Sequence, residues 1–199
     1  DSLMLSVSGV LFPCTSGATA STDGRTTGYW PFSFSGAVRV TRDVFVPTDG
    51  TFVRYVESFT NDTAAPISVR VQVGSSLGSG SSTFMVVPPA ATGGTYAVTD
   101  NSNGADGGGN PALGHVFGGA GAAVAPIAQF YDGNWTPNVR WQITIAPGQT
   151  VSLMHFQTQR VLRADAQAQA TALANLTDPV ALIGLTPAQR ASIVNFVVP

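Results

Sequence analysis

The stretch GAVRVTRDVFVPTDGTFVRYVESFTNDTAAPISVRVQV, residues 36–73, decides the fold. Apolar side chains recur at alternate positions in three runs, at 38–46, 53–59 and 67–73. A period of two is that of a β-strand, whose side chains point alternately to opposite faces. Pro-Thr-Asp-Gly and then Asn-Asp-Thr-Ala-Ala-Pro separate these runs and are typical of turns. The stretch therefore predicts three strands, the last two joined as a hairpin.

The same alternation predicts strands in other parts of the chain. Residues 3–7, 139–145 and 150–160 show it, and shorter strands are predicted at 84–87 and 96–98. Gly-, Asn- and Ser-rich segments separate them. Many short strands between turn segments favour an all-β fold, and we predict a mostly antiparallel β-sandwich over residues 1–160.

The last forty residues have a helical rather than a strand pattern. Residues 162–176 are rich in Ala and Gln, and apolar residues stand at helical spacing at Leu162, Ala166, Ala170 and Leu173. Further on, Thr-Pro-Ala-Gln at 186–189 combines an N-cap, a first-turn Pro and the Gln of a capping box. We predict that residues 161–199 form a small helical pair packed on the sandwich, within a single domain.

Composition excludes several classes of function. The 199 residues carry nine basic and 11 acidic side chains, and every basic one is Arg. The lack of a basic excess argues against nucleic-acid binding, and the lack of Lys excludes P-loop and Schiff-base chemistry. Cys14 is the single Cys, which excludes an internal disulfide framework. No apolar run reaches the roughly 18 residues of a membrane helix, so no membrane insertion is predicted.

Two segments carry a family resemblance: FVRYVESFTN at 52–61 with its Ala-Pro turn, and IAPGQTVSL at 145–153. Together they resemble β-sandwich modules of large secreted or surface-attached bacterial proteins. These modules are of the immunoglobulin-like or galactose-mutarotase-like supersandwich type. The resemblance implies a secreted or cell-surface location and a non-catalytic role in adhesion, assembly or glycan binding. It implies that the partner is a polysaccharide, or another domain or subunit of a larger assembly.

The alternative function is a carbohydrate-active enzyme of the mutarotase-like sandwich type. That chemistry requires a His as general acid and a carboxylate as base, which points to Glu57 with His115 and His155. However, His155 stands between Met154 and Phe156, as a hydrogen-bonded core His would. Both interpretations stay open at this stage.

Aromatic residues in Gly-rich and Asn-rich segments are the candidate ligand-binding residues. An exposed ring can stack on a sugar face while neighbouring polar groups bond its hydroxyls. The alternative interpretation is that these rings cover the ends of the core. The candidates are Tyr29, Trp30, Tyr131, Asp132 and Trp135.

The run of Asn, Asp and Gly at 100–110 is a candidate calcium site. Calcium takes six to eight oxygen ligands on a loop that can curl around it. The segment lacks the bidentate Glu of an EF-hand, and such tracts also form ordinary surface turns. The candidate ligands are Asp100, Asn101, Asn103, Asp106 and Asn110.

Overall fold

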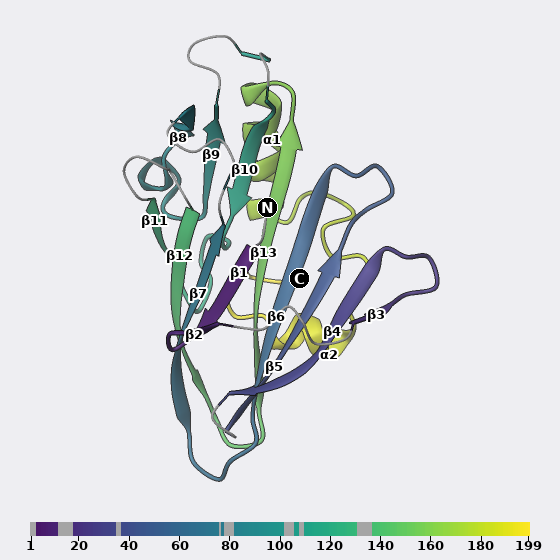
Figure 1. The fold of residues 1–199 in the computed structure, drawn as a ribbon, viewed down its shortest axis with the longest axis vertical. Helices are drawn as coiled ribbons and strands as arrows, with labels where there is room; N and C mark the ends of the chain where they lie inside the picture. The colour runs from purple at the N-terminus through teal and green to yellow at the C-terminus, as the bar shows by residue number, and fades with distance from the viewer. Residues whose placement is uncertain are drawn as a thin grey trace.

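Two antiparallel β-sheets pack face to face in the computed structural model, as Figure 1 shows. The structure describes residues 3–11, 18–34, 37–75, 77, 82–101, 106–107, 110–130 and 137–199. One sheet has eight strands in the order β3-β4-β5-β6-β13-β10-β9-β8, and the other has five in the order β11-β12-β7-β1-β2. The predicted all-β sandwich is therefore confirmed.

Strands lie at all the predicted places, and the sheets also contain β2, β3, β4, β10 and β11, which were not predicted. In the eight-stranded sheet they are β3 (Ala18–Ala20), β4 (Thr26–Phe34), β5 (Val38–Phe45), β6 (Phe52–Asn61), β13 (Thr150–Arg160), β10 (Ala112–Val116), β9 (Tyr96–Asp100) and β8 (Phe84–Val87). In the five-stranded sheet they are β11 (Ile127–Phe130), β12 (Pro137–Ile145), β7 (Ile67–Ser75), β1 (Leu3–Val7) and β2 (Val10–Leu11). A short 3-10 helix, η2 (Pro89–Thr92), joins β8 to β9.

The predicted hairpin between the second and third runs is wrong. β6 lies in the eight-stranded sheet and pairs with β13, whereas β7 lies in the five-stranded sheet and pairs with β12. The turn at 62–66 therefore carries the chain from one sheet to the other, and the turn at 146–149 carries it back. The alternation of apolar side chains along β6 and β7 is the same whether the two strands lie side by side in one sheet or face each other across a core. The alternation therefore could not distinguish a hairpin from a crossing between sheets.

Asn61 holds these two connections together. Its backbone N–H donates to the carbonyl of Gln149 at 3.0 Å. Its side-chain amide donates to the carbonyls of Ala65 at 2.8 Å and Ile145 at 2.9 Å. Its Oδ1 accepts from the backbone N–H of Thr63 at 2.9 Å. Asn61 is fully buried, and because it bonds both turns it fixes the corner where the sheets meet.

The main hydrophobic core lies between the sheets. Buried side chains from both sheets form it, including Val38, Val40, Phe59, Val69, Val71, Val73, Val139, Trp141, Ile143, Ile145 and Leu153. The strand β5 departs from strict alternation near its end, where Phe45 is buried on the opposite face. Val46, part of the same alternating run, is consequently exposed.

The C-terminal region covers the outer face of the eight-stranded sheet. It contains α1 (Arg163–Ala174) and α2 (Pro187–Ser192), which confirms the helical pair. Ala166, Ala170 and Leu173 are buried as predicted, but Leu162 precedes the helix and is exposed. The capping box of Thr186 and Gln189 is present. No helix in the described ranges has the length and apolar character required to cross a membrane.

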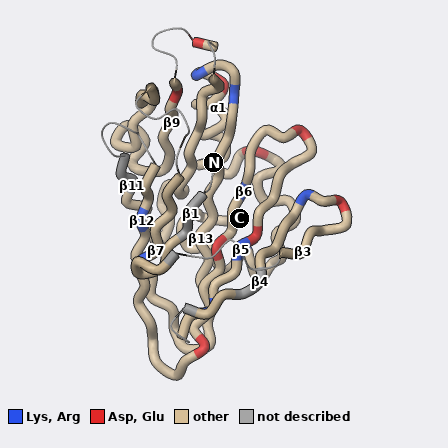
Figure 2. Tube along the Cα trace, viewed as in Figure 1, with Lys and Arg blue, Asp and Glu red and all other residues tan. Residues whose placement is uncertain are grey.

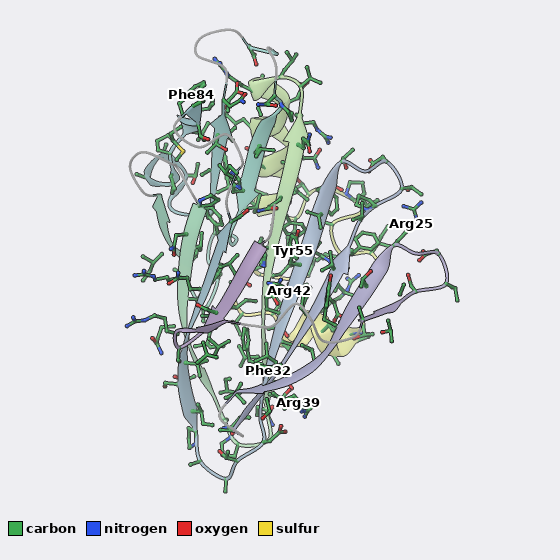
Figure 3. The ribbon with its side chains drawn as sticks, in the orientation of Figure 1. Arg25, Phe32, Arg39, Arg42, Tyr55 and Phe84 are labelled. Carbon is green, nitrogen blue, oxygen red and sulfur yellow. The ribbon has the colours of Figure 1, made fainter. Side chains whose placement is uncertain are left out.

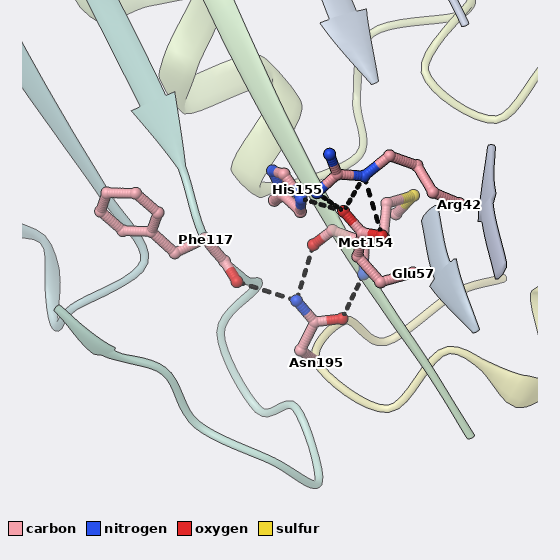
Figure 4. Close-up of polar contacts among 6 residues, drawn as sticks. All are labelled: Arg42, Glu57, Phe117, Met154, His155 and Asn195. Carbon is pink, nitrogen blue, oxygen red and sulfur yellow. Dashed lines mark hydrogen bonds and ion pairs between the residues drawn. The ribbon is translucent and has the colours of Figure 1, made fainter. Parts of the chain in front are cut away.

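Two buried polar residues fasten this region to the sheet. Asn195 donates from Nδ2 to the carbonyls of Phe117 at 2.8 Å and Met154 at 2.7 Å, and it accepts from the backbone N–H of Met154 at 2.9 Å (Figure 4). Arg54 reaches the same region from β6 and donates to two of its carbonyls. The outer face of this sheet is therefore part of the core rather than a free surface.

Candidate functional site

A buried cluster of Arg42, Glu57 and His155 lies between the sheets. The three residues come from the neighbouring strands β5, β6 and β13, and Arg42 is opposite Glu57 in the strand register. Arg42 Nη2 lies 2.7 Å from Glu57 Oε1, and Arg42 Nε lies 2.9 Å from the same atom. His155 Nε2 lies 3.2 Å from Glu57 Oε1 (Figure 4). Sequence reasoning paired Glu57 with a His, and the structure brings Glu57 and His155 together.

The charges within this cluster compensate one another. Burial by itself raises the pKa of the Glu57 carboxyl, but Arg42 and the hydrogen bond from His155 outweigh it and hold the pKa below its ordinary value. Burial lowers the pKa of His155, even though Glu57 acts in the opposite direction. Glu57 is therefore ionised and His155 neutral near pH 7. In that state the imidazole N–H donates to a carboxylate that Arg42 already neutralises.

Aromatic rings enclose the cluster. The rings of Tyr55 and His155 stack with centroids 4.8 Å apart and an angle of 9° between their planes. The Arg42 guanidinium lies 5.7 Å from the Tyr55 ring centroid, and both residues project from adjacent strands (Figure 3). Trp141, from the opposite sheet, has its ring 6.4 Å from that of His155. Because of this packing, Glu57 has no exposed surface.

His115 lies away from this cluster, at the boundary of two cavities. Its Nε2 lies 2.9 Å from Thr99 Oγ1, and burial lowers its pKa to about 4. The inner cavity has a volume of about 20 Å³ and also borders His155 and Trp141. The outer cavity has a volume of about 260 Å³ and opens beside the turn between β5 and β6. Ser75 and Gln157 border both cavities. His155 borders only the inner cavity and Glu57 borders neither, so the three candidate catalytic residues do not share one open pocket.

Among the described residues, the cavity next to His155 is too small for a sugar ring. A cavity of about 20 Å³ holds one water molecule at most, because a water needs roughly 10–15 Å³ of such volume. Glu57 borders neither of the two cavities, and a general base must come within hydrogen-bond reach of its proton. His115 is neutral at pH 7, with its pKa near 4. The cluster thus combines shifted pKa values with a small neighbouring cavity in the described part of the chain.

The predicted ligand-binding aromatics fall mostly outside the described residues. Tyr29 is half-buried and packs against the core between the sheets. The backbone of Trp30 belongs to β4, but its side chain is not among those described. Tyr131, Asp132 and Trp135 lie outside the described ranges. Their role in glycan binding stays a prediction.

Two predicted calcium ligands bond Arg163 instead. The buried Asp100 accepts from Arg163 Nε at 2.7 Å, and Asp106 accepts from the backbone N–H of Arg163 at 2.9 Å. The Arg163 guanidinium lies 4.8 Å from the centroid of the Phe84 ring, labelled in Figure 3. Asn101 and Asn110 are described, whereas Asn103 is not. The described residues contain no group of three acidic, His or Cys residues suited to a metal, and calcium binding stays a prediction.

Sequence reasoning missed Arg42, the partner that determines the state of Glu57. A signal for it was present, because Arg42 shares the inward face of β5 with Val38 and Val40. A cation on such a face requires a buried counter-charge, and Glu57 is the one Glu in the chain. The pairing itself depends on which strands are neighbours, which alternation alone does not determine.

Comparisons with known proteins show which solved structures have a similar fold. No protein-family model and no curated protein sequence matches this chain. Among solved structures, heparinase III aligns with a TM-score of 0.53 and 14% identity over 81% of this chain and 24% of its own. A candidate kojibiose phosphorylase from the human microbiome aligns with a TM-score of 0.50 and 8% identity over 94% of this chain and 25% of its own. The α-galactosidase AgaA of Geobacillus stearothermophilus aligns with a TM-score of 0.50 and 9% identity over 86% of this chain and 32% of its own.

These likenesses concern the fold alone, because the identities are low. A galactose mutarotase related enzyme from Lactobacillus acidophilus aligns with a TM-score of 0.40, which does not support the mutarotase-like type in particular. The chain covers about a quarter to a third of the length of the three larger proteins. Its fold is thus similar to a β-sandwich portion of much longer proteins whose names are those of carbohydrate-active enzymes.

Proposed function

We propose that this chain is a non-catalytic β-sandwich module of a larger, secreted or cell-surface carbohydrate-active protein. The observation that carries the proposal is the burial of Glu57, which has no exposed surface and is neutralised by Arg42. A group so enclosed contributes to the stability of the sandwich and does not contact a substrate. The similarity to portions of longer carbohydrate-active proteins supports the modular part of the proposal.

The second candidate is catalysis of sugar mutarotation. The contact of Glu57 with His155 favours it, because the reaction needs a His as general acid and a carboxylate as general base. We give it second place because, of the two cavities described above, Glu57 borders neither and His155 borders only the one of about 20 Å³. The two functions differ in whether the isolated chain accelerates a reaction.

Polarimetry of freshly dissolved α-D-galactose tests the choice. We expect the optical rotation to relax at the spontaneous rate at every protein concentration. The matched variant His155→Asn keeps a neutral donor but removes the imidazole, and we expect it to behave like the wild type. A rate that rises in proportion to wild-type protein and returns to the spontaneous value with His155→Asn would contradict the proposal.

A further inference from the structure

The outer cavity, of about 260 Å³, lies on three neighbouring strands of the eight-stranded sheet, β6, β13 and β10. Gln157 of β13 stands opposite Val53 of β6 on one side and opposite His115 of β10 on the other. Two residues further along β13, Gln159 stands opposite Leu113 of β10. All five residues line the cavity, and they alternate with residues that pack in the core on the outer face of the same sheet. The pairing of the strands thus places two amides on one wall of the cavity.

These two amides are available to a ligand. The side chains of Gln157 and Gln159 form no hydrogen bond with a described residue, although Gln157 is half-buried. An amide both donates and accepts hydrogen bonds, and so does a hydroxyl group. Val53, Leu77 and Leu113 add apolar surface to the same cavity. A few polar groups in a wall that is otherwise apolar are typical of small-molecule sites.

The lining of this cavity is uncharged. None of the described residues that line it is Asp, Glu, Lys or Arg. β10 contains no such residue, and β13 contains only Arg160, whose guanidinium bonds Gln169 of α1. Figure 2 accordingly shows β13 mostly in tan, the colour of uncharged residues. His115 is neutral at pH 7, because burial lowers its pKa to about 4. Since the transfer of a charge into such a site is costly, the lining favours a neutral ligand.

We propose that the outer cavity binds a single neutral sugar ring. The amides of Gln157 and Gln159 bond its hydroxyl groups, and its C–H groups pack on the apolar part of the wall. Pockets for drug-sized ligands have roughly 300–1,000 Å³, so a cavity of about 260 Å³ takes one ring rather than a longer chain. Glu57 borders neither cavity and has no part in this site. The choice of a sugar among neutral polyols rests on the proposed carbohydrate-associated function, whereas the uncharged, amide-lined cavity stands independently of it.

Saturation-transfer NMR and calorimetric titration test the proposal, with methyl α-D-galactopyranoside and methyl α-D-glucopyranoside as the probes. Their blocked anomeric centres cannot undergo mutarotation, so binding is measured apart from catalysis. We expect the wild type to bind at least one of them. We expect Gln157→Leu with Gln159→Leu to weaken that binding by roughly tenfold or more, because two hydrogen-bonding groups are lost while the side-chain volume is nearly kept.

Two further variants make the test specific. Val53→Phe narrows the cavity and leaves both amides in place, and we expect it to weaken binding as well. Gln167→Ala is the control, because it removes an exposed amide from α1, away from the cavity, and should bind like the wild type. Circular dichroism and urea unfolding of each variant separate a loss of binding from a loss of fold.

Four results would overturn the proposal. They are no binding of either glycoside by the wild type, undiminished binding by the Gln157 and Gln159 variant, undiminished binding by Val53→Phe, and an equal loss in the control variant. If D-galacturonate binds more tightly than both neutral glycosides, the cavity takes an anion and the proposal is wrong. Polarimetry tests the non-catalytic function separately, so each proposal can fail without the other.

Discussion

The two sheets of the sandwich differ in what their outer faces contact. The C-terminal helices and the segment around Asn195 pack on the outer face of the eight-stranded sheet over β9, β10 and β13, whereas outward residues near the β3–β5 edge, such as Arg39, stay exposed. In the five-stranded sheet, the outward side chains on β7 and β12 that alternate with the core positions are exposed or half-buried. A buried charged residue in the first sheet, such as Arg42, requires a partner for the sandwich to be stable, whereas an exposed one in the second, such as Arg70, does not.

The arginines on the two sheets illustrate this difference. Arg42 is 4% exposed and forms an ion pair with Glu57, while the side chain of Arg70 is exposed and forms no hydrogen bond or ion pair with a described residue. Perturbed pKa values occur in the first environment and point to an active site by the usual reasoning. Here the groups with shifted pKa values lie in a cluster whose charges compensate one another.

The largest expected effect is in the buried cluster. Glu57→Gln leaves the Arg42 guanidinium buried without a counter-charge, so we expect the free energy of unfolding to fall by about 3–5 kcal/mol. Urea unfolding at pH 7 measures it. The double variant Arg42→Met with Glu57→Leu removes both charges and should recover most of the loss. A loss below about 1 kcal/mol for Glu57→Gln would show that the cluster is not the structural element described here.

The next effect concerns the covered outer face of the eight-stranded sheet. Asn195→Ala removes three hydrogen bonds and leaves buried groups of Met154 and Phe117 without partners. We expect a loss of about 2–4 kcal/mol in unfolding free energy, measured by thermal and urea unfolding. Thr186→Ala, at the exposed N-cap of α2, is the comparison and should cost about 1 kcal/mol. Equal losses would mean that Asn195 does not fasten this region.

A third effect is a dependence of stability on pH. The pKa of His115 is about 4 in the folded chain and about 6.5 when unfolded, so between these values the unfolded chain binds the additional proton. The free energy of unfolding should therefore fall as the pH drops from 6.5 to 4, by up to about 3 kcal/mol from this group. Urea unfolding over a pH series measures the slope. His115→Gln should flatten it, and an unchanged slope would contradict the assignment.

The smallest effect is expected on the open face. Arg70→Gln should change the free energy of unfolding by no more than about 0.5 kcal/mol, because the side chain of Arg70 is exposed and such positions contribute little. Loss of stability comparable to that of Glu57→Gln would remove the contrast between the two sheets.

The alternation of side chains predicted the sandwich and part of its strands, whereas β2, β3, β4, β10 and β11 were not predicted. It placed β5, β6, β7, β12 and β13 correctly, because a half-buried strand needs a period of two. The capping box at Thr186 predicted the start of α2 for a similarly local reason. The partner of each strand was not predictable in this way, and β6 and β7 were wrongly joined as neighbours. Pairing is a property of distant segments, and alternation is local.

The candidate site was predictable in part for the same reason. Glu57 and His155 stood out because acidic and imidazole groups on apolar faces require partners. Their contact, however, spans 98 residues, and that of Glu57 with Arg42 depends on the register of β5 and β6. The wall of the outer cavity combines residues of β6, β10 and β13, which are distant in sequence. None of these strands indicates a cavity when it is considered alone.

The pairing of β6 with β13 and of β7 with β12 has a consequence for how the chain folds. Thr60 pairs with Thr150 and Ile67 with Ile145, so one edge of β6 and one edge of β7 lack a partner until residues 137–160 have been made, although β5 and β1 pair with the other edges. Such non-local pairing slows folding, and the two edges stay unpaired until then.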